Sequence, residues 1–342
     1  MTDLSCTWLG LNLRSPLIVG ASPLALTAER AREFVDAGAG ALVMPSLFEE
    51  QLIADQLAAH EFFDNYVDTN AEARSFLPET EVFSVGASPA MDRIRALCDA
   101  VAVPIIGSLN GVTPGGWTGF ARQLQDAGAS AIELNLYDVV TDLDESGEQI
   151  EQRQLRVVED VVAAVSVPVS VKLSPFYASV PNFVSRLESA GAAGVVTFNR
   201  YFQPDIDLET LDIDRHLVAS TSAELPLRLH ALAVLSGRTD LSLTCSGGVH
   251  SGTDAAKAIL CGAHAVQVVS ALLADGADAL AQIHRGLSAW LDDRGYEQVS
   301  QARGATSMAN VANPHELERV NYAHLLQSWQ PPRHRSPRLR NL

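Results

Sequence analysis

The chain has 342 residues, of which 47% are hydrophobic and 19% are charged, a composition typical of a globular protein. Its formal net charge of −17 would repel nucleic acids and anionic membranes. The amino-terminal segment lacks the basic and apolar regions of a signal peptide, so we predict a cytoplasmic protein without nucleic acid or membrane as a partner. The four cysteines are dispersed, which indicates neither a disulfide framework nor an iron–sulfur cluster, and we assign no metal ligands.

A repeated phrase predicts joints between helices and strands. It reads AGAGALVM at 37–44, AGASAIELNL at 127–136, AGAAGVVTFN at 190–199 and CGAHAVQVVS at 261–270. In each copy a glycine ends a helical pattern and an apolar, β-branched run follows, as expected where a helix leads into a buried strand. Proline at the first strand position marks two more such joints, at 104 and 168.

In chain order, the apolar runs predict strands near 17–20, 41–46, 104–109, 131–136, 168–173, 194–199, 241–246 and 265–270. Uniformly apolar strands are buried on both faces and are therefore typical of a parallel sheet. Helical patterns fall near 27–37, 88–101, 117–127, 148–165, 180–190, 225–236, 251–261 and 271–288. This alternation predicts an α/β fold, a single closed (β/α)8 TIM barrel.

Two segments depart from the alternation. The stretch 47–87 after the second strand is much longer than an ordinary connection, and we predict an insertion near the barrel mouth. Residues 326–342 concentrate proline and arginine, which predicts a disordered tail. The barrel domain is therefore assigned to residues 1–325.

The carboxyl ends of barrel strands hold the functional residues in this fold class. One of the two lysines of the chain, Lys172, lies in VKLSP at such an end, where a buried ammonium needs an anion or several acceptors. A structural ion pair is the alternative. Asn135 and Asn199 also end strands and could bind a polar ring or each other, whereas Asn110 precedes glycine and is equally typical of a turn.

The segment SGG at 246–248 follows the seventh strand, and VVSALL at 268–273 follows the eighth. Loops at these two places form the phosphate sites of many barrels, since glycine lets main-chain N–H groups approach an anion. A plain tight turn is the alternative for Gly247 and Gly248.

Several of these motifs together resemble the dihydroorotate dehydrogenase family, specifically its soluble class and dihydroorotate dehydrogenase-like proteins. The resemblance covers about residues 4–325 and is carried by ELNL (133–136), VKLSP (171–175), FN (198–199) and the run from 246 to 273. It implies noncovalent FMN across the barrel mouth. By position, the resemblance assigns Ala21, Ser22 and Ser46 to the isoalloxazine ring, Asn135, Lys172 and Asn199 to its polar edge and ribityl chain, and Gly247, Gly248, Val269 and Ser270 to the phosphate. The family usually has Gly-Thr where this chain has Val269-Ser270.

The substrate-facing positions depart further from the family. Asp138 stands at the position of the proton-abstracting Cys or Ser, and Val140 replaces a substrate-binding asparagine. Met44-Pro45-Ser46 replaces Thr-Lys-Ser, and residues 73–79 replace an asparagine-rich motif. We assign catalysis to Asp138, Tyr137 and Lys172, and substrate binding to Asn110, Asn135, Asn199 and Arg200. Arg200 could hold an anionic substrate or pair with the nearby Asp205 or Asp207.

The sequence thus predicts an FMN-dependent oxidoreductase acting on CH–CH groups, with hydride transfer from a small planar anionic substrate to flavin N5. Dihydroorotate or a related compound is the expected substrate, with a link to pyrimidine biosynthesis and an unidentified electron acceptor. The resemblance also makes a homodimer possible. Two alternatives remain at this point: a Schiff-base lyase that uses Lys172, and a flavin-binding module that lacks dihydroorotate turnover.

Overall fold

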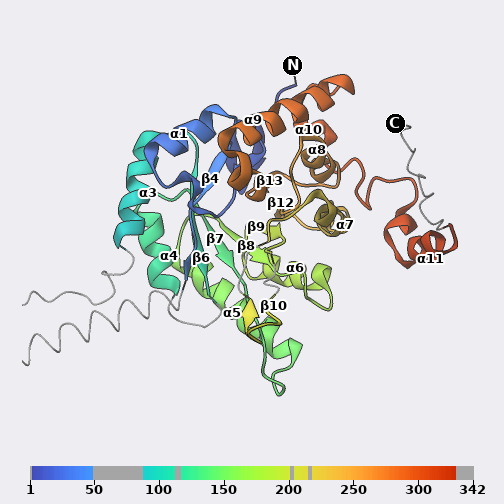
Figure 1. Ribbon diagram of the computed structural model, residues 1–342, viewed down its shortest axis with the longest axis horizontal. Helices are drawn as coiled ribbons and strands as arrows, with labels where there is room; N and C mark the ends of the chain where they lie inside the picture. The colour runs from blue at the N-terminus through green and yellow to red at the C-terminus, as the bar shows by residue number, and fades with distance from the viewer. Residues whose placement is uncertain (1, 49–87, 112–116, 201–203, 215–217, 329–342) are drawn as a thin grey trace, which may run out of the picture.

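The barrel is formed by parallel strands that close on themselves (Figure 1). The computed structural model describes residues 2–48, 88–111, 117–200, 204–214 and 218–328. Within these residues eight strands form the barrel, and β4 pairs with both β3 and β6 to close it. The strands are β3 (Leu17–Val19), β4 (Ala41–Val43), β6 (Ile105–Asn110), β7 (Ala131–Asn135), β8 (Val169–Leu173), β9 (Gly194–Thr197), β12 (Ser242–Ser246) and β13 (Ala265–Val268). The prediction of a (β/α)8 barrel is confirmed.

A layer of helices surrounds the strands (Figure 1). They are α1 (Ala28–Asp36), α3 (Ser88–Ala100), α4 (Trp117–Asp126), α5 (Gly147–Ala164), α6 (Val180–Ser189), α7 (Leu225–Leu235), α8 (Gly252–Leu260) and α9 (Ser270–Asp293). Serine or threonine side chains cap several of them, as Ser146 does at the start of α5. At the first predicted joint, Gly38 has φ +108°, the left-handed conformation that lets the chain leave α1 and enter β4.

An amino-terminal hairpin closes one end of the barrel. It consists of β1 (Cys6–Trp8) and β2 (Leu11–Leu13), and it places the fully buried Trp8 against residues at the starts of the strands. The indole Nε1 of Trp8 donates a hydrogen bond to Thr244 Oγ1 at 2.7 Å. The amino-terminal end of the barrel is thus filled, which leaves the carboxyl ends of the strands for a ligand.

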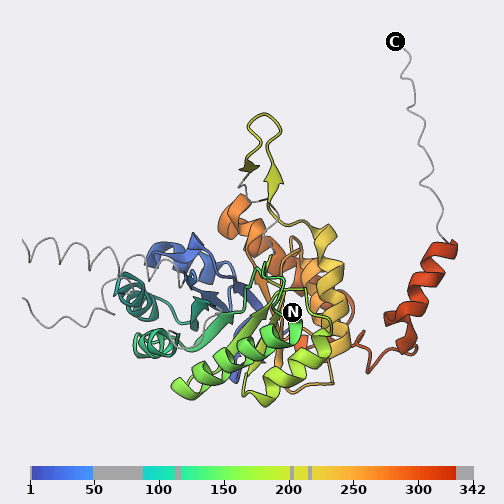
Figure 2. The ribbon, with the colours of Figure 1, turned by 90° about the horizontal axis from the view of Figure 1, so that it is seen from below.

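Further elements were not predicted. β5 (Leu47–Phe48) pairs with β6, and the hairpin of β10 (Asp205–Ile206) and β11 (Ile213–Asp214) projects beyond the barrel in Figure 2. The others are η1 (Pro23–Ala25), η4 (Ser222–Glu224), α10 (Val299–Ala302), η5 (Pro314–Leu317) and α11 (Arg319–Ser328). Figure 2 shows α11 standing apart from the barrel.

Two predicted segments fall largely outside the described residues. Of the insertion at 47–87, only Leu47 and Phe48 are described, and of the tail at 326–342 only residues 326–328, which end α11. In the described ranges no helix is both long and apolar enough to span a bilayer. The same ranges hold no cluster of three or more His, Cys, Asp or Glu side chains suited to a metal ion.

Candidate functional site

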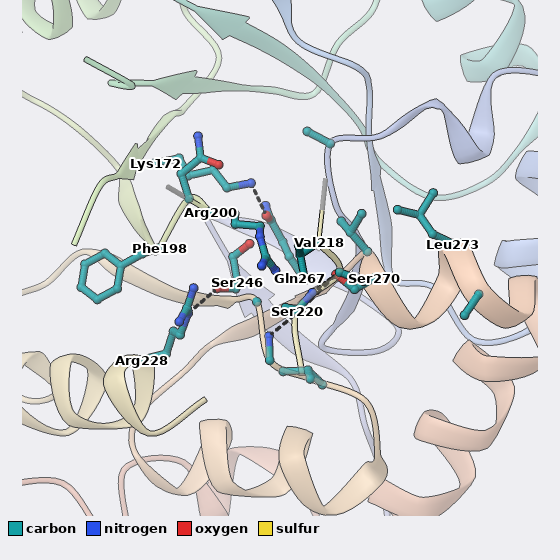
Figure 3. Close-up of a pocket in the computed structure, with 18 residues that line it drawn as sticks. Lys172, Phe198, Arg200, Val218, Ser220, Arg228, Ser246, Gln267, Ser270 and Leu273 are labelled. Atoms are coloured by element: carbon teal, nitrogen blue, oxygen red, sulfur yellow. Dashed lines mark hydrogen bonds between the residues drawn. The ribbon is translucent and has the colours of Figure 1, made fainter. Parts of the chain in front are cut away.

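A cavity of about 490 Å³ opens at the carboxyl ends of β8, β9, β12 and β13, and we name it the first cavity (Figure 3). This volume lies in the usual range of roughly 300–1,000 Å³ for small-molecule and cofactor sites. The predicted site residues that line it are Ala21, Lys172, Asn199, Arg200, Gly247, Gly248, Val269 and Ser270. The fold therefore brings together eight predicted residues from five separate stretches of sequence.

Lys172 enters the first cavity from β8 and is only 6% exposed. Its Nζ lies 3.0 Å from Gln267 Oε1 and 3.3 Å from Glu133 Oε1, and Gln267 also donates a hydrogen bond to Glu133. The ion pair considered as a structural alternative is thus present, although Lys172 still faces the cavity. A Schiff base needs a free amine, whereas these contacts hold Lys172 as a hydrogen-bond donor, so the geometry does not favour the lyase.

Gly247 and Gly248 turn the chain after β12, with φ values of +92° and +79°. A Cβ on Gly248 would lie 2.7 Å from the backbone nitrogen of Leu225, so a side chain does not fit there. The Gly248 N–H donates to Ser220 Oγ at 3.3 Å, and Ser220 Oγ donates to Ser270 Oγ at 2.9 Å. Main-chain and hydroxyl groups from three loops therefore meet at this end of the cavity, which suits an anion.

Arg228 of α7 also lines the first cavity, and it was missing from the sequence predictions. Its side chain contacts the turn after β12: Nε donates to the Ser246 carbonyl at 3.1 Å, and Nη1 donates to the Glu224 carbonyl at 2.8 Å (Figure 3 shows the first bond). Arg228 is only 5% exposed, and burial lowers the pKa of its guanidinium. The signal that could have found it is a lone arginine in the largely apolar run LPLRLHALAVL.

Arg200 follows β9 and lies between Lys172 and Ser220 in the view of Figure 3. Its Nη1 is 3.4 Å from Glu224 Oε1. The carboxylate beside it therefore comes from η4, and not from Asp205 or Asp207 in its own loop. A predicted substrate-binding residue thus shares the first cavity with the predicted cofactor residues.

The predicted asparagines form a hydrogen-bonded network beside the first cavity. Asn199 Nδ2 donates to Asn135 Oδ1 at 3.3 Å, and Asn135 Nδ2 donates to Ser46 Oγ at 3.1 Å. Ser108 Oγ, which was not predicted, lies 2.8 Å from Ser46 Oγ and joins the network. The mutual pairing of Asn135 and Asn199 that was considered as an alternative is therefore present.

Ser22 and Asn110 do not line the first cavity. The buried Ser22 hydroxyl donates to the Gly20 carbonyl at 2.9 Å. Asn110 is the last residue of β6, partly exposed and paired in register with Asn135 of β7. Both residues lie at the carboxyl ends of barrel strands, but neither forms part of the wall of the first cavity.

Asp138 lies in a second cavity, of about 730 Å³, between the loops after β7 and β8 and the helices α5 and α6. Its Oδ2 accepts a hydrogen bond from Arg153 Nη2 at 2.5 Å, and Arg153 also pairs with Glu145. Tyr137, the residue before it, is half-buried. The two cavities share no described lining residue, so the predicted base and the predicted cofactor residues are not in one wall.

The fold and the first cavity together define a class of protein, the (β/α)8 barrels with a cavity at the carboxyl ends of their strands. Residues 63–291 match the family model for dihydroorotate dehydrogenase. The chain belongs to the dihydroorotate dehydrogenase family and is an oxidoreductase of that type, which confirms the resemblance seen in the sequence.

Three relatives span most of the chain. The chain is 30% identical to the catalytic subunit of dihydroorotate dehydrogenase B (NAD(+)) from Methanosarcina acetivorans, over 86% of this chain and 93% of the relative. It is 26% identical to the protein of the same name from Methanothermobacter thermautotrophicus, over 86% and 95%. It is 24% identical to NAD-dependent dihydropyrimidine dehydrogenase subunit PreA from Escherichia coli, over 93% and 80%.

Proposed function

We propose that the protein is an FMN-dependent oxidoreductase that oxidises a CH–CH bond of a small planar anionic compound. The observation that carries this proposal is the first cavity, which offers anion-binding groups at Gly248, Ser220 and Ser270 and a buried cation at Lys172. A flavin is expected from membership of the family, and this set of donors suits a polar ring joined to a phosphate. Bound FMN would accept the hydride at N5.

Each predicted site residue would bind a different part of the cofactor or the substrate. Gly247, Gly248, Val269 and Ser270 would hold the phosphate, and Lys172 and Asn199 would donate to polar atoms of the ring and chain. The remaining assignments from the sequence are Ala21, Ser22, Ser46 and Asn135 for the cofactor. Arg200 would attract the anionic group of the substrate beside Asn110, Asn135 and Asn199.

Dihydroorotate or a related compound is the substrate that we propose, in pyrimidine metabolism. The names of the relatives refer to dihydroorotate and to dihydropyrimidine, two substrates of related form. In this proposal Asp138 takes a proton from the carbon next to the one that gives up hydride, and Tyr137 assists in moving that proton. Arg153 fixes the orientation of the Asp138 carboxylate through the 2.5 Å contact.

A second candidate function is a flavin-binding module that does not oxidise dihydroorotate. The observation that favours it is the pairing of Asp138 with Arg153 in the second cavity, because an ion-paired carboxylate outside the first cavity is poorly placed to reach a substrate over the flavin. Both candidate functions include bound flavin, but only the first includes oxidation of dihydroorotate.

The proposal also requires an electron acceptor that reoxidises the reduced flavin. The relatives carry two acceptors in their names, NAD(+) in the Methanosarcina acetivorans protein and fumarate in a putative enzyme from Aeropyrum pernix that is 28% identical over 60% of this chain. Two of the relatives described above are named catalytic subunits, so a partner chain is one route for the electrons. We expect light scattering to detect the predicted homodimer.

An absorption spectrum tests the cofactor, and anaerobic mixing with dihydroorotate tests the substrate. The proposal expects a visible flavin spectrum that bleaches on mixing, and it expects Asp138→Asn to retain the flavin while bleaching at least about 100-fold more slowly. Flavin that stays oxidised would favour the second candidate. Protein that takes up no added FMN would reject both.

A further inference from the structure

The charged side chains of the first cavity are all cations. Its described wall contains Lys172, Arg200 and Arg228 and no Asp or Glu. This is unexpected in a chain with a net charge of −17. Such a wall attracts an anion and stabilises it when it binds.

The three cations differ in how they are neutralised. Lys172 has Glu133 at 3.3 Å, and Arg200 has Glu224 at 3.4 Å. Arg228 binds only two backbone carbonyls, those of Ser246 and Glu224, and within the described residues no carboxylate lies within ion-pair distance of it. Glu224 acts on this guanidinium only through space. A buried guanidinium without an ion pair is costly, so this charge is not explained by packing alone.

The position of the guanidinium indicates what it faces. Its Nη2 lies 3.0 Å from the point that a Cβ on Gly247 would occupy, and so it lies against the turn after β12. In the described part of the chain Nη2 has no hydrogen-bond acceptor, while Nε and Nη1 are both used. The remaining donor therefore lies against Gly247, in the same cavity wall as Gly248, Ser220 and Ser270.

We propose that Arg228 binds the phosphate of the cofactor directly and makes the first cavity selective for a flavin phosphate monoester over riboflavin. This inference rests on the proposed function, because it assumes that the cavity takes a flavin. The cation adds to the main-chain donors of Gly247 and Gly248, and it gives this phosphate site a charged side chain as well as backbone groups. Charge-assisted hydrogen bonds from arginine to phosphate are stronger than neutral ones.

The test compares FMN with riboflavin on the full-length apoprotein. Flavin fluorescence gives the Kd of each ligand for the wild type, Arg228→Met, Arg228→Lys and the control Arg186→Gln, which removes a different arginine in the second cavity. We expect Arg228→Met to weaken FMN about 10- to 100-fold and riboflavin less than about threefold. Arg228→Lys should lie between the wild type and Arg228→Met, and Arg186→Gln should match the wild type.

A second measurement needs no flavin. Inorganic phosphate should raise the Tm of the wild-type apoprotein above its value in chloride of equal ionic strength, and it should not do so for Arg228→Met. Equal losses of FMN and riboflavin affinity in Arg228→Met would overturn the inference, because Arg228 would then only brace the turn. No protection of the wild type by phosphate would overturn it too. A wild type that binds neither flavin but is protected by phosphate through Arg228 would reject the proposed function and leave the anion site standing.

Discussion

The first and second cavities both open at the carboxyl ends of the barrel strands, but they balance charge differently. In the second cavity each charged side chain has an opposite partner: Asp138 pairs with Arg153, and Glu148 and Glu151 pair with Arg186. In the first cavity Arg228 is buried with no ion-pair partner among the described residues, and the Glu224 carboxylate acts on it only through space. Paired charges are explained by packing between helices, whereas a buried cation without an ion pair favours the binding of an anion. The comparison indicates that charge balance distinguishes the two cavities better than volume, since the second is larger.

The largest loss of stability is expected from a substitution inside the barrel, at the carboxylate that pairs with Lys172. Glu133→Gln removes the carboxylate that neutralises Lys172, and leaving one member of a buried pair unpaired typically costs about 3–5 kcal/mol. We therefore expect the free energy of unfolding of the apoprotein in urea to fall by about that amount.

The double variant Glu133→Gln with Lys172→Met is the control for that pair. It removes both charges, so it should recover at least about half of the loss, as a double-mutant cycle for a coupled pair requires. If Glu133→Gln alone lowers the free energy of unfolding by less than about 1 kcal/mol, Glu133 does not neutralise Lys172. Arg228 would then not be the one cation of the first cavity that differs from the others.

A smaller loss of stability is expected from a substitution in the turn after β12. Gly248→Ala places a side chain at φ +79° and 2.7 Å from the backbone nitrogen of Leu225. The backbone strain costs about 1–3 kcal/mol, and the displaced turn should also weaken FMN at least about tenfold. Thermal unfolding and a flavin titration measure the two effects.

The matched control is Gly119→Ala on α4, where an added Cβ meets nothing within 4 Å. Alanine is preferred over glycine in a helix by about 1 kcal/mol, so this variant should be slightly more stable than the wild type and should bind FMN equally well. If the two glycine variants have equal stability and equal FMN affinity, the turn does not need a glycine in the left-handed conformation.

The barrel could be predicted because its signals are local in sequence. Parallel strands are buried on both faces and so appear as continuous apolar runs, and six of the eight follow a glycine that ends a helix or begin at a proline. Gly247, Gly248 and Lys172 were also found this way, since their positions follow from the ends of single strands. Local patterns therefore predicted the fold and three residues that line the first cavity.

The partners of those residues could not be predicted, because they depend on register between distant strands. Lys172 meets Gln267, which is 95 positions away, and Glu133, which is 39 positions away. Arg228 lies in a helix between two barrel strands, and only the folded chain shows that it reaches the turn after β12. The position of Asp138 next to Arg153 likewise depends on how the loop after β7 lies over α5.

The smallest effect is expected from Arg186→Gln in the second cavity. The Nη1 atom of Arg186 lies 2.6 Å from Glu151 Oε2, and the two side chains are 28% and 17% exposed. Partly exposed pairs of this kind contribute up to about 1 kcal/mol, and salt screens them, so the loss of stability should be of that size and should shrink in 1 M salt. FMN affinity should not change, because no cofactor residue is assigned to this wall. A loss of FMN affinity of tenfold or more would show that both cavities serve one ligand, and charge balance would then no longer separate a binding site from a structural network.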